Sequence, residues 1–488
     1  MPKLRILPQN MELEVASGRN LQNIFREAGI YQDAPCGGNG TCGKCKVLID
    51  GKEALACRTV VCCDLTVTIP ETTLLQTLRT GIQASPAPGI AADGHLLAID
   101  IGTTSVVCFL LDGVTGKELA QSSMRNPQAV FGADVISRIQ AALQGALEEE
   151  IKLIRDGVHT LIQMVCADAG ISPERISTVS VVGNPAMQQL FLGISPANLA
   201  IVPFAPVLTK IGTAPCGNIL PICPNARLLI IPDISGYIGA DTMGCILAAE
   251  LYKKDEITLL VDIGTNGEMV LGNKDRMIAC STAAGPALEG ACIHFGMRAE
   301  NGAIDHVWLE NDEVKCSVIG GGAAKGICGS GLVDAIAVGL KTGLLNKRGR
   351  IQNKDHIFRL TDTVYLTQED IRQVQLAKGA ICAGIYLMAK KMQMEVTDIQ
   401  KVLLAGAFGS YMNPQSACRM GLLPEELLNR IEVVGNAAGS GAKMLARDER
   451  LLAPVQQLTE KIEFLELANL PEFSKIFAKA MNFREEMS

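Results

Sequence analysis

Two stretches of the chain carry the same pattern. Residues 96–105 are LLAIDIGTTS, and residues 258–267 are TLLVDIGTNG. Each is an apolar run, typical of a buried strand, that ends in Asp-Ile-Gly-Thr with its acidic residue at Asp100 or Asp262. A repeated strand–loop unit predicts two homologous lobes with a cleft between them.

The chemistry of such a loop favours a phosphate ligand. The turn behind the strand presents backbone N–H groups that bind phosphate oxygens. The carboxylate at the end of the strand holds Mg²⁺, usually through water. Two loops, one in each lobe, therefore predict a site that grips the triphosphate of ATP from both sides. Its residues are Asp100 and Asp262 for Mg²⁺, and Gly102, Thr103, Thr104, Gly264, Thr265 and Asn266 for ATP.

The rest of the chain divides around these loops. Strand-like and helical segments alternate from residue 95 to the end, which predicts an α/β architecture with lobe one at about 95–255 and lobe two at about 256–488. Residues 83–94 are rich in Ala, Pro and Gly, and we expect them to form a linker. Residues 1–82 then form a separate N-terminal domain.

Composition excludes several classes of protein. Hydrophobic residues make up 48% of the 488 residues, which argues against global disorder. A formal net charge of −7, with both signs mixed, argues against broad nucleic-acid binding, which needs a basic face. No apolar run approaches the ~18 residues of a membrane span, and residues 1–20 lack the apolar core of a signal peptide. We therefore expect a cytoplasmic protein that binds neither nucleic acid nor membrane.

The N-terminal domain carries a loop rich in cysteine and glycine. Around it the sequence predicts a hairpin over residues 3–16, a helix with Ser17 as its N-cap, and a second hairpin across Asp50-Gly51. Five residues separate Cys36 from Cys42, and two separate Cys42 from Cys45.

Cys57 follows Cys45 after eleven residues and completes a set of four thiolates. Four thiolates on one loop and a returning strand suit a 2Fe–2S cluster, with Cys36, Cys42, Cys45 and Cys57 as the iron ligands. A structural zinc site is the alternative, although it usually uses two Cys-x-x-Cys pairs, and only Cys42 and Cys45 form one.

Cys62 and Cys63 are alternatives to Cys57 as the fourth ligand. We expect Cys57, because neighbouring side chains on a strand point to opposite faces. Residues 1 to about 80 resemble a ferredoxin domain of the β-grasp fold, an α+β fold that holds a 2Fe–2S cluster. The short gap before the last cysteine resembles that of ferredoxin domains built into larger redox enzymes.

The paired loops resemble the phosphate-1 and phosphate-2 motifs of the superfamily of acetate and sugar kinases, heat-shock chaperones and actin. The resemblance implies a two-lobed, ribonuclease H-like ATPase domain with a catalytic polar residue about twenty positions before the second loop. Asp241 fits this place, as the acid that orients the attacking water or a magnesium-bound water. The alternative role for Asp241 is a carboxylate that serves a helix dipole.

The same resemblance implies an adenosine site at a glycine-rich turn after a strand of the second lobe. Residues 403–409, LLAGAFG, fit this description, and two other glycine clusters are further candidates. The residues expected there are Gly406, Gly409, Gly321, Gly329 and Ser330. The chain has neither a P-loop nor a clear dinucleotide-binding motif.

The combination of the two domains resembles the reductive activators of corrinoid-dependent methyltransferases. Shared motifs include Asn126-Pro-Gln, Gly183-Asn184, Gly329-Ser-Gly-Leu and Gly435-Asn-Ala-Ala-Gly. Longer members carry an extra middle domain, whereas here only the linker separates the two parts. The resemblance implies an enzyme that uses ATP and its 2Fe–2S cluster to return an inactive cobalt(II) corrinoid protein to cobalt(I).

The implied partners are the corrinoid protein and a low-potential electron donor, either a ferredoxin or a flavodoxin. Superfamily relatives commonly pair, so a homodimer is also expected. Two alternatives stay open: an ATP-dependent electron-transfer activator of another radical enzyme, and a redox-sensing or assembly module that nucleotide merely switches.

Overall fold

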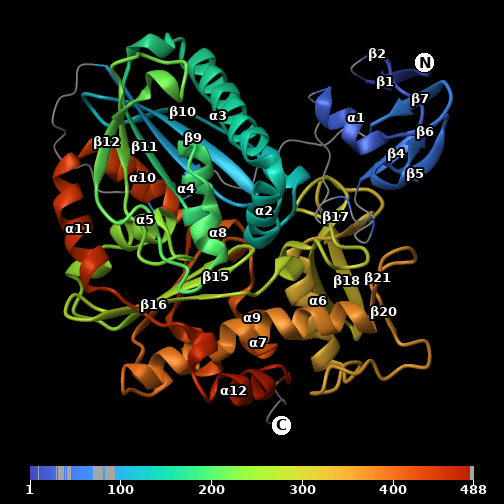
Figure 1. The fold of residues 1–488 in the computed structure, drawn as a ribbon. Helices are drawn as coiled ribbons and strands as arrows, with labels where there is room; N and C mark the ends of the chain where they lie inside the picture. Colours follow the sequence, from blue (N-terminus) through green and yellow to red (C-terminus); the bar gives the residue numbers. More distant parts are fainter. Residues whose placement is uncertain are drawn as a thin grey trace.

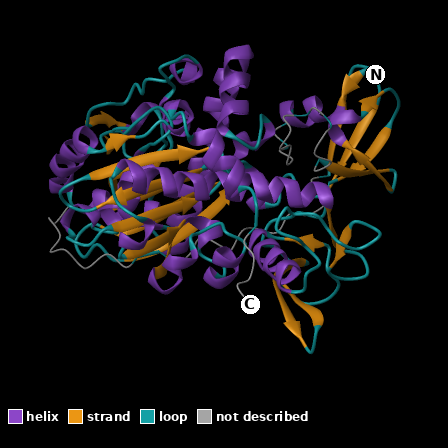
Figure 2. Ribbon diagram, turned by 90° about the horizontal axis from the view of Figure 1, so that it is seen from below, coloured by secondary structure: helices purple, strands orange, loops and turns teal. Residues whose placement is uncertain are grey.

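The repeated stretches form the central strands of two six-stranded sheets. The computed structural model describes residues 1–8, 10–28, 30, 38, 40, 45–69, 81–82 and 94–483. Within these residues, a small N-terminal domain lies at one end of a larger body that contains both sheets (Figure 1). The view from below shows the same separation of the N-terminal strands from the sheets of the body (Figure 2).

The first sheet belongs to lobe one. Its strands are β8 (His95–Ile101), β9 (Ser105–Asp112), β10 (Glu118–Arg125), β11 (Ile176–Gly183), β12 (Gly212–Pro215) and β13 (Arg227–Ile230). Their order is β10-β9-β8-β11-β13-β12. The first three strands form an antiparallel meander, β11 and β13 run parallel to β8, and β12 is antiparallel to β13.

The second sheet belongs to lobe two. Its strands are β14 (Thr258–Ile263), β15 (Gly267–Gly272), β16 (Met277–Thr282), β22 (Lys401–Ala405), β23 (Ile431–Gly435) and β24 (Glu463–Phe464). Their order is β23-β22-β14-β15-β16-β24. Again three strands form an antiparallel meander, and β22 and β23 run parallel to the first of them.

The two sheets therefore repeat one topology over five of their six strands, and the sixth strands, β12 and β24, lie at different edges. In each, a meander is followed by two parallel strands on the other side of its first strand, which explains why the sequence repeat begins at β8 and at β14. Burial along β8 agrees with a strand covered on both faces. Leu96 and Ala98 pack into the core that the lobes share, whereas Leu97 and Ile99 pack into the outer core of lobe one.

Helices cover the sheets, and smaller sheets extend lobe two. The helices are α2 (Val135–Ala141), α3 (Leu147–Ala169), α4 (Pro185–Leu192), α5 (Ala240–Ala248), α6 (Gly329–Lys341), α7 (Gln368–Lys391), α8 (Gly406–Gly409), α9 (Pro414–Arg419), α10 (Ala437–Arg447), α11 (Leu452–Lys461) and α12 (Phe473–Ala480). The small strands are β17 (Ala303–Glu310), β18 (Glu313–Val318), β19 (Gly326–Ile327), β20 (Ile357–Arg359) and β21 (Tyr365–Thr367). No helix among the described residues is long and apolar enough to span a bilayer.

Helices α5 and α10 pack against each other between the two sheets, in the core that both lobes share. Their backbones approach closely at two glycines. A Cβ atom added to Gly441 would lie 2.1 Å from the carbonyl oxygen of Gly244. A side chain at either position would therefore push the helices apart, and with them the lobes.

The N-terminal domain has its own sheet and core. Its elements are β1 (Lys3–Leu7), β2 (Met11–Glu14), β3 (Arg19–Asn20), α1 (Leu21–Glu27), β4 (Lys46–Ile49), β5 (Lys52–Leu55), β6 (Val60–Val61) and β7 (Leu65–Thr68). The five-stranded sheet has the order β2-β1-β7-β4-β5, with β1 and β7 parallel. Both predicted hairpins are present. The guanidinium of Arg26 on α1 lies 4.8 Å from the ring centre of Phe131 in lobe one.

One local prediction in this domain is wrong. The N-cap of α1 is Asn20 rather than Ser17: the Asn20 side chain accepts hydrogen bonds from the backbone N–H of Gln22 and Asn23. Asn20 also donates its Nδ2 to the Cys57 carbonyl oxygen at 2.8 Å, so a contact distant in sequence favours it. The predicted linker falls almost wholly on residues 83–93, outside the described residues.

Candidate functional site

The structure brings the two predicted loops together. Asp100 and Asp262 are the last residues but one of β8 and β14, and each loop closes with a backbone hydrogen bond, from Gly102 in the first loop and from Gly264 in the second. The hydroxyl oxygens of Thr104 and Thr265, one from each lobe, lie 3.2 Å apart. The two loops therefore face each other across the contact between the lobes.

Buried polar side chains support the first loop. Asn126 Nδ2 donates to the Gly102 carbonyl oxygen at 2.8 Å, and Asn184 Nδ2 donates to the Thr103 hydroxyl at 3.0 Å. Arg138, which has no exposed surface, donates to the Thr103 carbonyl oxygen.

Sequence analysis assigned these three residues no role. The signal that could have revealed them is a polar side chain inside an otherwise apolar segment. Such a side chain needs a hydrogen-bond partner when it is buried.

Acidic side chains gather behind the loops. Burial raises the pKa of Asp100 to about 7; a hydrogen bond from Asn436 opposes this shift, and the charges of Asp241 and Asp262 add to it. Burial also raises the pKa of Asp241 to about 7, and raises that of Asp262. Glu268, which pairs with Asp262 across β14 and β15, has a pKa raised well above its usual value for the same reason. So many enclosed carboxylates favour a cation among them.

Asp233 is a further acid of this group that the sequence analysis missed. It is 1% exposed, neither of its carboxylate oxygens has a hydrogen-bond partner, and burial raises its pKa, with the charge of Asp241 adding to the shift. It stands shortly after the apolar strand β13, whereas Glu268 lies inside β15. Both were detectable as acids within or close to buried strands, although neither belongs to the repeated Asp-Ile-Gly-Thr pattern.

Asp241 lies where both of its predicted roles remain open. It stands in the first turn of α5, and its Oδ1 accepts a hydrogen bond from the Thr242 amide at 2.7 Å, as a helix N-terminal carboxylate does. Its charge also acts on Asp100, Asp233 and Glu268. Within the described residues, no group of three His, Cys, Asp or Glu side chains is placed to hold a metal ion directly. Carboxylates that hold the ion through water fit the preference of Mg²⁺ for retaining its waters and for phosphate oxygens.

The predicted adenosine residues lie in three places. Gly406 follows β22 with a φ of +87°, and a Cβ atom there would lie 2.4 Å from Asp262 Oδ1, so only glycine fits beside the carboxylate. Gly409 ends the short helix α8 that Gly406 begins. Both glycines therefore lie at the carboxyl end of the strand next to β14.

The other candidates lie on different elements of lobe two. Gly329 begins α6 and packs against the ring of Phe408, while the Ser330 hydroxyl donates to the Asp305 carbonyl oxygen at 2.8 Å. Gly321 lies in an exposed turn after β18, in the small three-stranded sheet. Roles in adenosine binding stay predictions for all of them.

A cavity of about 180 Å³ opens beside the two loops and is lined from both lobes. Its lining includes Thr103, Thr104, Arg138, Glu289 and Arg298. Glu289 ends the 3₁₀ helix η8 (Pro286–Glu289) and was not predicted. The cavity thus combines hydroxyl and guanidinium donors, which are the groups that bind phosphate.

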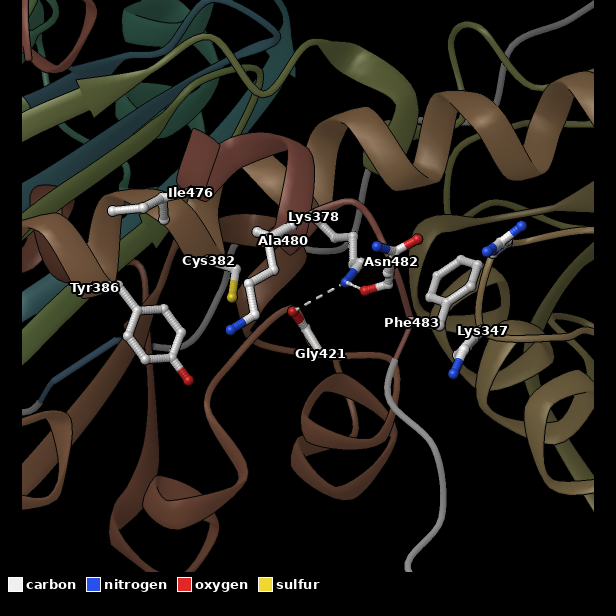
Figure 3. A pocket seen from close by; sticks show the side chains of 11 residues that line it. Lys347, Lys378, Cys382, Tyr386, Gly421, Ile476, Ala480, Asn482 and Phe483 are labelled. Carbon is white, nitrogen blue, oxygen red and sulfur yellow. Dashed lines mark hydrogen bonds between the residues drawn. The ribbon is translucent and has the colours of Figure 1, made fainter. Parts of the chain in front are cut away.

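A second, larger cavity of about 640 Å³ lies between α7 and α12 in lobe two (Figure 3). Lys378 donates to the carbonyl oxygens of Asn482 at 2.6 Å and Gly421 at 3.5 Å, and Phe483 lines the same space. None of the predicted site residues lines it.

Two of the four predicted cluster ligands fall within the described residues. Cys45 is buried at the start of β4, and Cys57 lies in the 3₁₀ helix η1 (Ala56–Arg58), where its amide donates to Cys45 Sγ at 3.5 Å. Amide–sulfur hydrogen bonds of this kind surround iron–sulfur clusters. Cys62 and Cys63 are exposed. Cys36 and Cys42 lie outside the described residues.

Two described glycines of the cysteine loop have a backbone conformation that side chains rarely adopt. Gly40 has a φ of +73°, and a Cβ atom there would lie 2.4 Å from Arg58 Nε. Gly38 has a φ of +88°, and a Cβ atom there would lie 2.9 Å from Gln22 Oε1. The amide–sulfur hydrogen bond from Cys57 to Cys45 and these two glycines fit a 2Fe–2S cluster.

Comparison with known families agrees with this architecture. Residues 4–62 match the family model described as a 2Fe-2S iron-sulfur cluster binding domain. Residues 96–254 match the RACo middle region, and residues 256–488 match the C-terminal domain of RACo, the ASKHA domain. The chain is thus a ferredoxin domain joined to an actin-like ATPase of the ASKHA class, and the middle region of the family corresponds to the predicted lobe one.

The relatives are more specific. The chain is 37% identical over 413 residues to the corrinoid activation enzyme RamQ of Eubacterium limosum, covering 78% of this chain and 69% of RamQ. It is 26% identical to the [Co(II) methylated amine-specific corrinoid protein] reductase of Methanosarcina barkeri, over 79% of this chain and 76% of that protein. A solved structure of a reductive activator for corrinoid, iron-sulfur protein superposes with a TM-score of 0.73 at 29% identity, covering 99% of this chain and 98% of the other. The chain belongs to this family of corrinoid reductive activators.

Proposed function

We propose that this protein is an ATP-dependent reductase that returns an inactive cobalt(II) corrinoid protein of a methyltransferase system to cobalt(I). The observation that carries the proposal is the pairing of Thr104 with Thr265 across two lobes of one topology, in a chain that also carries the cysteine loop. Similarity to RamQ and to the Methanosarcina reductase supports the choice of substrate.

The iron–sulfur domain would be the source of the electron that reduces cobalt. Cys36, Cys42, Cys45 and Cys57 would hold a 2Fe–2S cluster, which would supply the single electron that reduces the substrate from cobalt(II) to cobalt(I). Plant-type clusters work at about −400 mV, above the potential that this reduction needs. The transfer is therefore uphill, and a second source of free energy is required.

The ATPase domain provides that source. The backbone N–H groups of both loops and the hydroxyls of Thr104 and Thr265 would bind the phosphates, and the carboxylates of Asp100 and Asp262 would hold Mg²⁺, which would neutralise the charge of the phosphates. Asp241 orients the attacking water or a magnesium-bound water. Because the phosphates contact both lobes, their binding and hydrolysis change how the lobes sit, and this change alters the affinity for the corrinoid partner.

The remaining partners follow from the potential. A donor that reduces the cluster again needs a comparably low reduction potential, so we propose a ferredoxin or a flavodoxin. We also propose that this protein and its donor work in the cytoplasm. We also propose a homodimer, which size-exclusion chromatography with light scattering tests directly.

An anaerobic assay tests the function. Protein, ATP, a low-potential donor and a cobalt(II) corrinoid protein are mixed, and the visible absorbance of cobalt(I) is followed, with a donor that cannot reduce the corrinoid alone. We expect cobalt(I) with wild type, and none with Cys57→Ser, which loses a cluster ligand. The matched control Cys62→Ser, an exposed cysteine close in sequence, should behave as wild type.

The energetic role of ATP needs its own comparison. Asp241→Asn should keep a reducible cluster and the partner but lose hydrolysis, and with it the formation of cobalt(I). If cobalt(I) forms at the same rate with ATP omitted, hydrolysis does not drive the reduction, and the nucleotide-switched module becomes the better description.

A further inference from the structure

One carboxylate joins the two phosphate loops. Glu289 accepts hydrogen bonds from the Thr104 hydroxyl at 3.1 Å to each of its oxygens, and from the Thr265 hydroxyl at 2.9 Å. Thr104 belongs to lobe one and Thr265 to lobe two. Glu289 is half-buried in the cleft and lines the cavity beside the loops.

The surroundings of this carboxylate are those of a bound phosphate. It is held by the two hydroxyls that the phosphates need. Burial raises the pKa of Glu289, while the charge of Arg298, the hydrogen bonds from the two hydroxyls and the charge of Arg138 oppose that shift and favour the carboxylate form. A carboxylate and a phosphate oxygen accept the same charge-assisted hydrogen bonds. Both cannot occupy these donors at once, and two anions in one enclosed cavity repel each other strongly.

We propose that Glu289 is a built-in competitor of the nucleotide: its carboxylate occupies the terminal-phosphate position between Thr104 and Thr265, and the phosphates of ATP or ADP displace it on binding. This inference rests on the proposed nucleotide site. It gives the nucleotide-free protein a bridge between its lobes, and it makes Glu289 a determinant of nucleotide affinity rather than a catalytic residue.

Displacement of Glu289 would also move elements of lobe two that pack against η8. Residue Leu288, next to it in η8, presents its carbonyl oxygen so close to Gly329 that a Cβ atom there would lie 2.0 Å away. Movement of η8 therefore moves the start of α6. Strand β17, which follows η8 and precedes α6 in the chain, makes extensive contact with α6. In Figure 1, β17 lies on the side of the body that faces the N-terminal domain.

Nucleotide binding to charge-altered variants tests the proposal. Glu289→Gln keeps the size and one accepting oxygen but removes the charge, and Glu289→Ala removes the group. Dissociation constants of ATP, ADP and adenosine are measured by calorimetry on the full chain with its cluster. Glu300→Gln is the matched control, because Glu300 lines the same cavity while the two threonine hydroxyls donate to Glu289 and not to Glu300.

We expect Glu289→Gln and Glu289→Ala to bind ATP and ADP about tenfold more tightly than wild type, the effect of one hydrogen bond to a charged group. Adenosine has no phosphate, so its affinity should not change, and Glu300→Gln should match wild type. Unchanged or weaker ATP binding by Glu289→Gln overturns the proposal. Unchanged affinity with lost hydrolysis overturns it too and makes Glu289 a catalytic residue instead.

A measurement on wild type covers the case in which a variant does not fold. Hydrogen–deuterium exchange should become faster in the peptide that contains Pro286–Glu289 when ATP binds, while the peptide containing residues 102–104 becomes protected. Protection of both peptides overturns the proposal. If ATP protects neither loop in wild type, the nucleotide site itself is wrong, so the two failures are distinguishable.

Discussion

The two phosphate loops share a sequence but differ in their surroundings. In lobe one, three buried side chains from outside the loop hold it: Asn126, Arg138 and Asn184. In lobe two, most hydrogen bonds of the loop are to its own backbone or to groups of the cleft, namely Glu268, Glu289 and Thr104 of loop one, and one comes from the Cys245 thiol of α5 to Asp262. Loop one is thus set by the scaffold of its lobe, whereas the geometry of loop two depends on what occupies the cleft.

The largest expected effect tests what the loops share. Asp100→Ala and Asp262→Ala should each lower ATP hydrolysis at least about a hundredfold, because each removes a carboxylate that holds Mg²⁺ near the developing charge. The measurement is steady-state ATPase activity. Cluster absorbance should stay normal in both variants, since the cysteines belong to a separate domain. Full activity in either variant would show that the duplication does not extend to function.

A second variant tests the close contact between α5 of lobe one and α10 of lobe two. Gly441→Ala places a methyl group against the Gly244 carbonyl and should lower the free energy of unfolding by about 2 kcal/mol, as overpacking typically does. Thermal unfolding measures the loss. The control is Gly212→Ala on the edge strand β12, where an added Cβ atom finds ordinary contacts at 3.5 Å. Equal stability of the two variants would contradict the close contact of α5 and α10.

A smaller effect tests the support of loop one. Asn184 caps α4, through a hydrogen bond from Met187 N, and also holds Thr103; Asn413 caps α9 in the same way without contacting either loop. Both variants to alanine lose a cap, worth about 1 kcal/mol. Only Asn184→Ala should also weaken ATP binding, by about tenfold. If Asn413→Ala weakens ATP binding equally, the support of loop one is not specific.

The smallest effect concerns pH. The pKa of Asp100 and that of Asp241 are raised to about 7 in the folded protein, so between about pH 4 and pH 7 the folded state binds more protons than the unfolded state. Stability of the nucleotide-free protein should therefore fall as pH rises through this range. This loss of stability with rising pH should be smaller in Asp100→Asn, because asparagine does not ionise. It should also be smaller when Mg²⁺ and ATP are bound. Thermal unfolding at pH 5 and pH 8 measures it.

Local patterns predicted the duplicated α/β architecture, because the repeat in the sequence is a repeat of strand and turn, but they did not predict the strand order. Asp100 and Asp262 could be singled out because an acid at the end of an apolar strand is rare, and their role as Mg²⁺ ligands stays a prediction. Ser17 and Asn20 are equally good N-caps by type, and only the contact of Asn20 with Cys57 decides between them. No local rule contains that contact.

The part of the site that sequence analysis missed has the same explanation. Glu289 acts through hydroxyls that lie far from it along the chain, 185 and 24 positions away. Its neighbours in sequence, Leu288 and Gly290, are ordinary turn and core residues. Glu289 can be recognised as a site residue only in the folded structure, where both loops lie next to it.

The glycine contact between α5 and α10 has a mechanical consequence. Because no side chain intervenes between Gly244 and Gly441, the two helices lie at backbone distance there, within one of the most extensive contacts of the fold. This contact is the natural pivot between the lobes: a small rotation about it moves nearby atoms little, while the displacement grows with distance from it. Rotations too slight to disturb the packing of α5 and α10 therefore become large at the outer ends of the lobes.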